Sequence, residues 1–196
     1  MTHRPLRLLG LAGSLRRESW NRQLLQSAAA LAPIGATMEV YDALGSVPLF
    51  DEDLEHASPD GPPGVRALRE AIAAADGLVI ATPEYNHALP GVLKNALDWL
   101  SREDRVLGEL PVAVLGASSG PWGTRLAQAS LRQVLHTCGA LVMPAPTLFV
   151  ALADTRFDPQ GRLADPALHA SLARFMEAFA GWIARVTPAD ALSDVA

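Results

Sequence analysis

The 196-residue sequence contains a single cysteine, Cys138, so an intramolecular disulfide and a cysteine-rich zinc site are both excluded. No apolar run reaches the roughly 18 residues that a membrane-spanning helix requires. Residues 1–5 do not begin a secretory signal, because the short apolar stretch that follows them runs directly into a glycine turn. We therefore expect a cytoplasmic protein with no membrane partner.

Two common nucleotide-binding motifs are also missing. The pattern G-x-G-x-x-G does not follow the first apolar run, and the pattern G-x-x-x-x-G-K-[ST] occurs nowhere. A net charge of −5 argues against a general nucleic-acid binder. With 49% hydrophobic and 19% charged residues, the chain is expected to fold. The length favours one domain over residues 1–187, with a flexible tail over residues 188–196.

Short apolar runs alternate with segments of helical periodicity, which is typical of stacked βαβ units. The strands are continuously apolar, which indicates a parallel sheet covered on both faces. Five strands fit an α/β three-layer sandwich with the strand order 2-1-3-4-5. The predicted strands span residues 6–12, 37–41, 77–81, 110–115 and 140–150; helices are predicted from residue 19, over 65–75, 90–102 and 123–138, and from an N-cap at residue 165, with a long polar loop over 42–64.

In such a sheet, ligands bind beyond the carboxyl ends of the strands where the strand order reverses, here between the first and third strands. The loop after the first strand, residues 13–21, leads into a helix N-terminus, which favours a phosphate. Ser14, Ser19 and Asn21 add short hydrogen-bond donors, and Arg16 adds a guanidinium fork. The alternative is that Ser19 only caps the helix and the arginines are solvated.

The loops after the third and fourth strands also carry unusual chemistry. Residues 82–91 combine two stiffening prolines with the aromatic face of Tyr85, which suits a flat heteroaromatic ligand. The alternative is an ordinary strand-to-helix turn with Pro90 near the first helical position. Most of residues 116–123 are glycine, alanine or serine, and such small residues allow close backbone approach. Side-chain hydroxyls with one arginine suit a mononucleotide such as FMN better than a nucleoside triphosphate with magnesium.

Three segments resemble the NADPH-dependent FMN reductase family. Residues 13–21 are similar to its G-S-L-R-x-x-S-x-N segment, and residues 83–99 to its P-E-Y-N-x-x-x-P-G-x-L-K-N-A-x-D-W segment. Residues 116–120 are similar to its third segment, together with Arg125, Gln128, Leu131 and Arg132 further along the chain. The resemblance covers about residues 6–150. Trp20 and the Pro121-Trp122 pair depart from the family pattern and leave the shape of the acceptor pocket open.

The resemblance implies a flavodoxin-like fold, tightly bound FMN, and flavin reduction by NADPH or NADH. It also implies a small-molecule electron acceptor such as a quinone, azo compound, metal oxyanion or free flavin, and a homodimer or homotetramer with FMN near a subunit interface. By matched position, the phosphate contacts are Ser14, Arg16, Ser19 and Asn21, the isoalloxazine contacts are Pro83, Glu84, Tyr85 and Asn86, and the other side of the ring is bordered by Ser118 and Gly120.

The predicted function is thus an NAD(P)H-dependent FMN oxidoreductase. Hydride transfer requires oriented contact rather than a side-chain acid, so no catalytic residue is expected. No histidines stand at metal-ligand spacing, and Cys138 is expected to be an inert core thiol. The alternative is a non-enzymatic electron carrier or redox sensor with the same FMN site. A hydrolase of phosphate ligands is disfavoured, because the first loop has no nucleophile motif.

Overall fold

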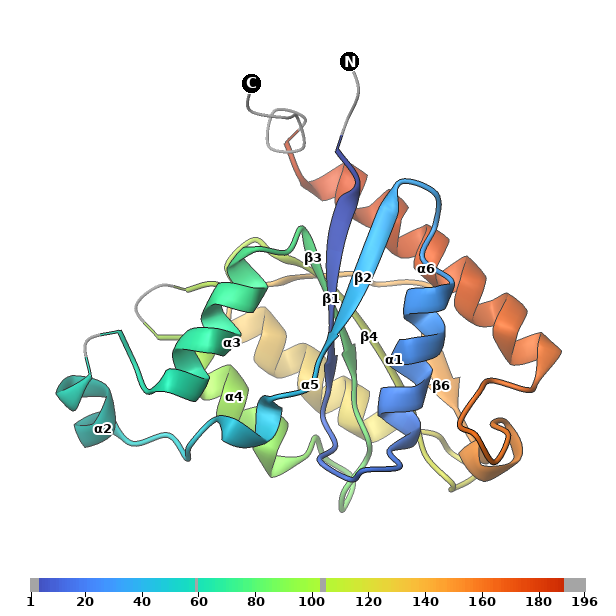
Figure 1. Ribbon diagram of the computed structural model, residues 1–196, viewed down its shortest axis with the longest axis horizontal. Coiled ribbons are helices and arrows are strands. Elements are labelled where there is room, and N and C mark those ends of the chain that lie inside the picture. Colours follow the sequence, from blue (N-terminus) through green and yellow to red (C-terminus); the bar gives the residue numbers. More distant parts are fainter. Residues whose placement is uncertain (1–3, 59, 103–104, 189–196) are drawn as a thin grey trace.

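The computed structural model describes residues 4–58, 60–102 and 105–188. A parallel sheet lies at its centre, with the order β2-β1-β3-β4-β5 and a further strand, β6, that also pairs with β4 (Figure 1). This is the predicted order, and the flavodoxin-like class is confirmed. The strands are β1 (Leu6–Ala12), β2 (Ala36–Tyr41), β3 (Gly77–Ala81), β4 (Pro111–Ala117), β5 (Leu141–Val142) and β6 (Leu148–Val150).

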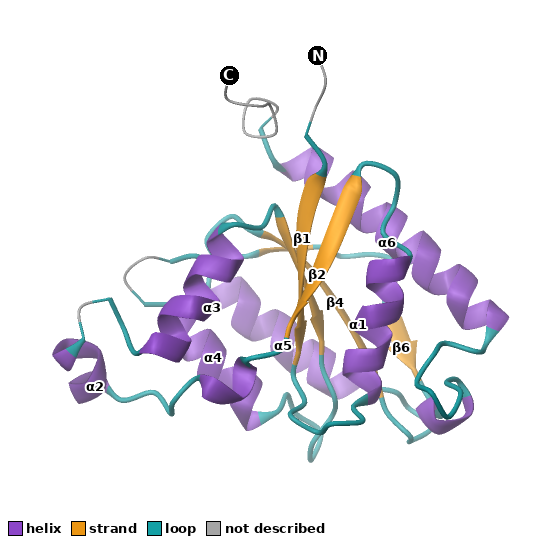
Figure 2. Cartoon of the chain, viewed as in Figure 1, coloured by secondary structure: helices purple, strands orange, loops and turns teal. Residues whose placement is uncertain are grey.

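Helices cover both faces of the sheet, as the continuous apolar strands require. The helices α1 and α6 lie on one face, and α3, α4 and α5 lie on the other (Figure 2). Each face buries its own hydrophobic cluster, so the sheet is the boundary between two cores. The helices are α1 (Trp20–Ala30), α2 (Glu52–Ala57), α3 (Pro63–Ala73), α4 (Gly91–Leu100), α5 (Arg125–Thr137) and α6 (Pro166–Val186), with 3₁₀ turns at Leu44–Ser46 and Ala153–Thr155.

The stretch predicted as one strand over residues 140–150 forms two short strands instead. β5 pairs with the start of β4 and β6 pairs with its end, so both lie on the same side of β4. Pro144 and Pro146 lie between them and cannot donate to the ladder, and the Ala145–Pro146 peptide bond is cis. Five positions across the sheet are therefore filled as predicted, with the last position interrupted.

The segment predicted as a long loop over residues 42–64 contains the helix α2 and the beginning of α3. α2 is capped by Asp51, whose carboxylate accepts the Asp53 N–H at 2.8 Å, and no residue of α2 is buried. Acidic residues in its first turn complement the helix dipole. The sequence prediction missed α2 because the helix lacks the apolar periodicity by which a helix is recognised.

The same segment is fastened to α4 by polar side chains. The Pro48 carbonyl accepts hydrogen bonds from Asn95 Nδ2 at 2.8 Å and from Trp99 Nε1 at 2.9 Å. Asn95 Oδ1 accepts the Phe50 N–H at 2.7 Å. Asn95 and Trp99 belong to the segment over residues 83–99 that resembles the family, and here their side chains hold a covering loop. Glu55 and Arg102 add an ion pair at 2.9 Å.

Among the described residues, no helix is both long and apolar enough to cross a membrane. Asp165 caps α6 by accepting the N–H groups of Ala167 and Leu168, with Pro166 in the first turn, as the sequence predicted. The tail predicted from residue 188 onward lies, apart from Pro188, outside the described residues.

Candidate functional site

The carboxyl ends of β1, β3 and β4 carry a cavity of about 250 Å³. We call the three segments around it the first loop (residues 13–19), the second loop (residues 82–90) and the third loop (residues 118–124). β1 pairs with both β2 and β3, so the cavity lies where the strand order reverses. The lining residues are Ser14, Arg16, Ser19, Trp20, Asn21, Pro83, Glu84, Tyr85, Ala117, Ser118 and Ser119.

The first loop ends in a capped helix N-terminus that points into this cavity. Ser19 Oγ accepts the Arg22 N–H of α1 at 3.4 Å, and the Ser19 side chain is nearly fully buried. Its hydroxyl proton is still free to donate, and the first N–H groups of α1 have no partner within the helix. Arg16 lies 5.6 Å from the centre of the Trp20 ring and is exposed. This is a donor set suited to a phosphate.

Asn21, also predicted to contact a phosphate, joins two elements of the scaffold. Its Nδ2 donates to the Ala117 carbonyl at 3.0 Å, and its Oδ1 accepts the Ala117 N–H at 2.9 Å. The side chain is buried and lines the cavity. It thereby fixes the N-terminus of α1 against the end of β4, and one amide proton is left for a ligand.

The second loop is held by the Glu84 carboxylate, which caps the neighbouring helix α5. Glu84 Oε2 accepts the N–H groups of Leu126 at 2.9 Å and of Ala127 at 3.0 Å. Its other oxygen lies 3.6 Å from His87 Nδ1. A carboxylate at a helix N-terminus gains both from hydrogen bonds and from the helix dipole. Glu84 therefore ties the second loop to the helix that follows the third loop.

The second loop also closes on itself as a tight hairpin. Tyr85 and Ala88 exchange both backbone hydrogen bonds, at 3.0 and 3.1 Å. The two residues between them, Asn86 and His87, both have positive φ, at 49° and 65°. Asn tolerates this conformation well, and the pair gives the backbone twist that a two-residue hairpin needs. The Tyr85 ring is half-exposed at the hairpin base.

The third loop is packed closely against the strands below it. A Cβ at Gly116, the last β4 residue but one, would lie 2.2 Å from Thr124 Oγ1 and 2.3 Å from the Thr82 carbonyl. Ser118 Oγ donates to the Gly123 carbonyl at 2.8 Å, and the Ser118 N–H donates to the Val150 carbonyl at 3.0 Å. The loop and β6 thus form one unit that borders the cavity.

The structure brings most of the predicted residues together in this one cavity. The two exceptions are Asn86, at the hairpin tip, and Gly120, in the third loop, which belong to the bordering loops but do not line the cavity. Sequence reasoning did not include Trp20, Ala117 and Ser119 among the site residues. Trp20 stands out as a bulky residue in a polar loop, and its ring stacks on Phe157, with 5.6 Å between the ring centres.

Other reactive residues lie outside this cavity. Within the described ranges, no three His, Cys, Asp or Glu side chains form a group that could hold a metal ion. Cys138 packs against the core beside α5. Burial raises the pKa of its thiol, and the charge of Asp98 adds to this effect. The thiol is therefore kept protonated and is a poor nucleophile.

The order of the strands defines the class, a flavodoxin-like α/β protein. Its capped helix N-terminus beside an aromatic hairpin suits a mononucleotide. A family comparison gives the more particular result. Residues 6–155 match the model of the NADPH-dependent FMN reductase family, and the chain belongs to that family. This confirms the predicted family and the predicted class of enzyme, an oxidoreductase.

Individual relatives agree with this assignment. The chain is 41% identical over 182 residues to the NAD(P)H-dependent FMN reductase of Pseudomonas aeruginosa, covering 92% of this chain and 97% of the relative. It is 39% identical over 180 residues to the 2-hydroxy-1,4-benzoquinone reductase of a Burkholderia species, covering 91% and 96%. The solved structure of FerB, a flavoenzyme NAD(P)H:(acceptor) oxidoreductase from Paracoccus denitrificans, superposes with a TM-score of 0.82 at 31% identity, covering 92% and 98%.

The cavity fits FMN by its own chemistry. A phosphate requires clustered donors, which the first loop and the start of α1 supply at one end of the cavity. A flavin ring requires a flat, stiff wall, which the hairpin of the second loop supplies. Ser14, Arg16 and Ser19 would hold the phosphate, and Pro83, Tyr85 and Ser118 would border the ring.

Proposed function

We propose that the protein catalyses the oxidation of NADPH or NADH with a small quinone as electron acceptor, using bound FMN as its cofactor. The observation that carries this proposal is one cavity in which the phosphate donors of the first loop adjoin the stiff aromatic hairpin of the second loop. The family and the quinone reductase named among its relatives support the same activity.

The chain's own residues provide position rather than acid–base chemistry. FMN, when bound, supplies the ring system that accepts and donates hydride. Glu84 fixes the second loop to α5, and Asn21 fixes α1 to the end of β4, so that both substrates meet a wall of constant shape. The wall matters because hydride transfer depends steeply on the distance and orientation of the reacting atoms.

The overall reaction balances without any residue being consumed. The nicotinamide nucleotide gives up two electrons and one proton as hydride, and one further proton comes from solvent. Together these convert a quinone to its hydroquinone and leave the oxidised nucleotide. Because nucleotide and quinone would use the same open face of the cavity in turn, we expect ping-pong kinetics.

An anaerobic titration tests the proposal. Protein loaded with FMN should lose the visible absorbance of its oxidised flavin when NADPH or NADH is added, and should regain it when benzoquinone is added. Protein that binds FMN but is reduced by neither nucleotide would be a non-enzymatic electron carrier or sensor instead. Protein that does not bind FMN at all would refute the cofactor assignment.

We also propose that the protein forms a homodimer or homotetramer through the rim of this cavity. Four large side chains are exposed there: Tyr85, Trp122, Leu126 and Leu152. They come from adjoining segments, because Glu84 bonds the Leu126 N–H and the Leu152 N–H donates to Gly120. An apolar patch around a polar site is typical of an interface. Sedimentation of Trp122→Ser should show a weakened assembly, and an unchanged assembly would place the interface elsewhere.

A cytoplasmic location completes the proposal. Cys138, the single cysteine of the sequence, is a free thiol in the structure, which suits a reducing compartment. Reduced nicotinamide nucleotides are the electron source in the proposed reaction. Cell fractionation would test the location directly, and recovery of the protein outside the cytoplasmic fraction would refute it.

A further inference from the structure

A second cavity of about 250 Å³ adjoins the first, on the other side of the first loop. It lies between the ends of β1 and β2 and the start of the 3₁₀ turn at Leu44–Ser46. The two cavities share Ser14 and Arg16. A ligand with two charged groups could therefore occupy both regions at once. The residues lining the second cavity are Ala12, Ser14, Leu15, Arg16, Arg17, Arg22, Tyr41, Asp42, Leu44 and Gly45.

The charge of this second cavity is strongly positive, although the whole chain carries a net charge of −5. Three arginines line it against one acidic residue, Asp42. Asp42 is partly offset by Arg22, whose Nη2 lies 3.5 Å from its carboxylate. Within the described part of the chain, Arg17 makes no ion pair. A dianion is attracted by an exposed guanidinium that lies beside two others and pairs with no carboxylate.

Tyr41 adds a hydrogen-bond donor to the same wall. Its hydroxyl is buried and has no hydrogen-bond partner in the structure, which is costly for a polar atom. Burial, and then the neighbouring charge of Asp42, raise the pKa of Tyr41 above its usual range. The hydroxyl thus stays protonated at neutral pH. It is therefore a donor without an acceptor in a residue that lines a cavity with three arginines.

We propose that this arginine pocket binds the 2′-phosphate of NADPH, and so makes the enzyme prefer NADPH to NADH. The inference rests on the proposed function, because it concerns the nucleotide that reduces the bound flavin. The 2′-phosphate is a monoester with a charge of about −1.5 to −2 at pH 7. NADH carries a hydroxyl at the position of this phosphate on its adenosine ribose. Its binding would therefore leave the charge of the three arginines unbalanced.

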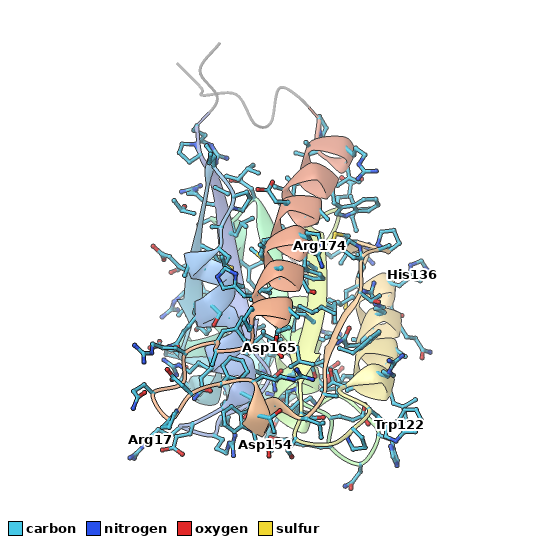
Figure 3. All side chains as sticks on the ribbon, turned by 90° about the vertical axis from the view of Figure 1, so that its right-hand side faces the viewer. Arg17, Trp122, His136, Asp154, Asp165 and Arg174 are labelled. Carbon is cyan, nitrogen blue, oxygen red and sulfur yellow. The ribbon has the colours of Figure 1, made fainter. Side chains whose placement is uncertain are left out.

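The position of the pocket separates this role from that of the FMN phosphate. The FMN phosphate belongs at the N-terminus of α1, where Ser19 and Asn21 line only the first cavity. Arg17, Arg22 and Tyr41 line only the second. Arg16 lines both, so substitutions of Arg17 are the cleaner test of the second cavity. Arg17 lies at the same end of the molecule as Trp122 in the third loop (Figure 3).

The test compares two ligands that differ only by the 2′-phosphate. Isothermal calorimetry would measure binding of adenosine 2′,5′-bisphosphate and of 5′-AMP to the FMN-loaded protein. We expect the bisphosphate to bind at least about tenfold tighter, which corresponds to about 1.4 kcal/mol, and we expect salt to weaken that preference. Inorganic phosphate serves as a third probe; if it binds as tightly as the bisphosphate, the pocket is a general anion site and the proposal is wrong.

Three variants sharpen the result. Arg17→Gln should remove most of the preference for the bisphosphate and for NADPH over NADH in kcat/KM. Asp42→Asn removes the acidic residue of the pocket and should increase both preferences. Arg174→Gln is the matched control, because Arg174 is an exposed arginine on α6, away from the loops (Figure 3), and should change neither.

The outcomes keep the two proposals apart. Equal affinity for the bisphosphate and 5′-AMP, with FMN still reduced by NADH, would overturn the arginine pocket and leave the proposed function intact. Failure of both NADPH and NADH to reduce the bound FMN would overturn the proposed function. Unchanged selectivity in both Arg17→Gln and Asp42→Asn would also overturn the pocket, since an exposed side chain can be replaced without unfolding the protein.

Discussion

The first and second loops line one cavity but are built in opposite ways. In the second loop the polar side chains and the backbone are bonded to the protein itself, through Glu84 to α5 and through the hairpin of Tyr85 and Ala88. In the first loop Leu15, Arg16 and Arg17 are exposed, and the donors point to open space. The wall proposed for the flavin ring is therefore formed before binding, whereas the end proposed for the phosphate would be completed by ligands.

This difference predicts that substitutions in or under the second loop weaken the fold, whereas substitutions of the exposed first-loop residues Leu15, Arg16 and Arg17 weaken binding alone. The free energy of unfolding of the FMN-free protein, measured by urea denaturation, separates the two kinds of effect. A first-loop variant that destabilised the FMN-free protein as much as a second-loop variant would break the comparison.

The largest loss of stability is expected for Gly116→Ala, beneath the second loop. The new methyl group would lie 2.2 Å from Thr124 Oγ1 and 2.3 Å from the backbone of Thr82, so the strand end would have to move. Overpacking of this kind costs about 3 kcal/mol. Gly91→Ala is the control, because no atom lies within 4 Å of a Cβ built there. Equal urea midpoints for the two variants would show that the strand end yields easily.

The next largest effect is expected for Glu84→Ala, which leaves the N–H groups of Leu126 and Ala127 without their carboxylate. We expect a loss of about 2 kcal/mol in stability and weaker FMN binding, because the hairpin is no longer fixed to α5. Glu84→Gln keeps an acceptor oxygen but not the charge, so its stability and FMN affinity should lie between those of the wild type and Glu84→Ala. An unaltered FMN dissociation constant in Glu84→Ala would show that the hairpin holds its position without α5.

The sequence indicated which loops form this site more fully than it indicated which hydrogen bonds fix those loops in place. Loops after the first, third and fourth strands could be placed together, because the carboxyl ends of parallel strands meet at one edge of the sheet. The order of the strands could be predicted because five strands fit the common order 2-1-3-4-5. The polar and aromatic residues of these loops could be recognised because each loop directly follows a short apolar strand.

The partners of individual side chains could not be predicted. Asn21 and Glu84 read as ligand contacts, yet Asn21 bonds Ala117, 96 positions further along the chain, and Glu84 caps a helix 42 positions away. A hydrogen bond between residues so distant in sequence has no local pattern. The helix α2 escaped prediction for a related reason, since it buries nothing and so has no apolar stripe.

A smaller effect is expected for Ser19→Ala, which removes the cap of α1. The Arg22 N–H would lose its acceptor at 3.4 Å, at a cost of about 1 kcal/mol. The same hydroxyl is one of the expected phosphate donors, so FMN binding should weaken as well. Ser19→Thr retains the hydroxyl and serves as the control in both measurements. If Ser19→Ala lowered only the stability and left FMN affinity intact, the hydroxyl would be a helix cap and nothing more.

The smallest effect on the fold is expected for Arg16→Gln, in the open half of the site. The guanidinium is exposed and makes no ion pair among the described residues, so the urea midpoint of the FMN-free protein should be unchanged. FMN affinity should fall about tenfold, because a charge-assisted contact to the phosphate contributes about 1.5–3 kcal/mol and is partly replaced by the amide.

A ligand without the phosphate separates this contact from the rest of the cavity. Riboflavin, measured by fluorescence quenching beside FMN, should bind the wild type and Arg16→Gln equally well, and added salt should narrow the difference in FMN affinity between the two proteins. A parallel loss of riboflavin affinity would mean that Arg16 shapes the wall for the ring, and the division of the site into a prepared half and an open half would then be wrong.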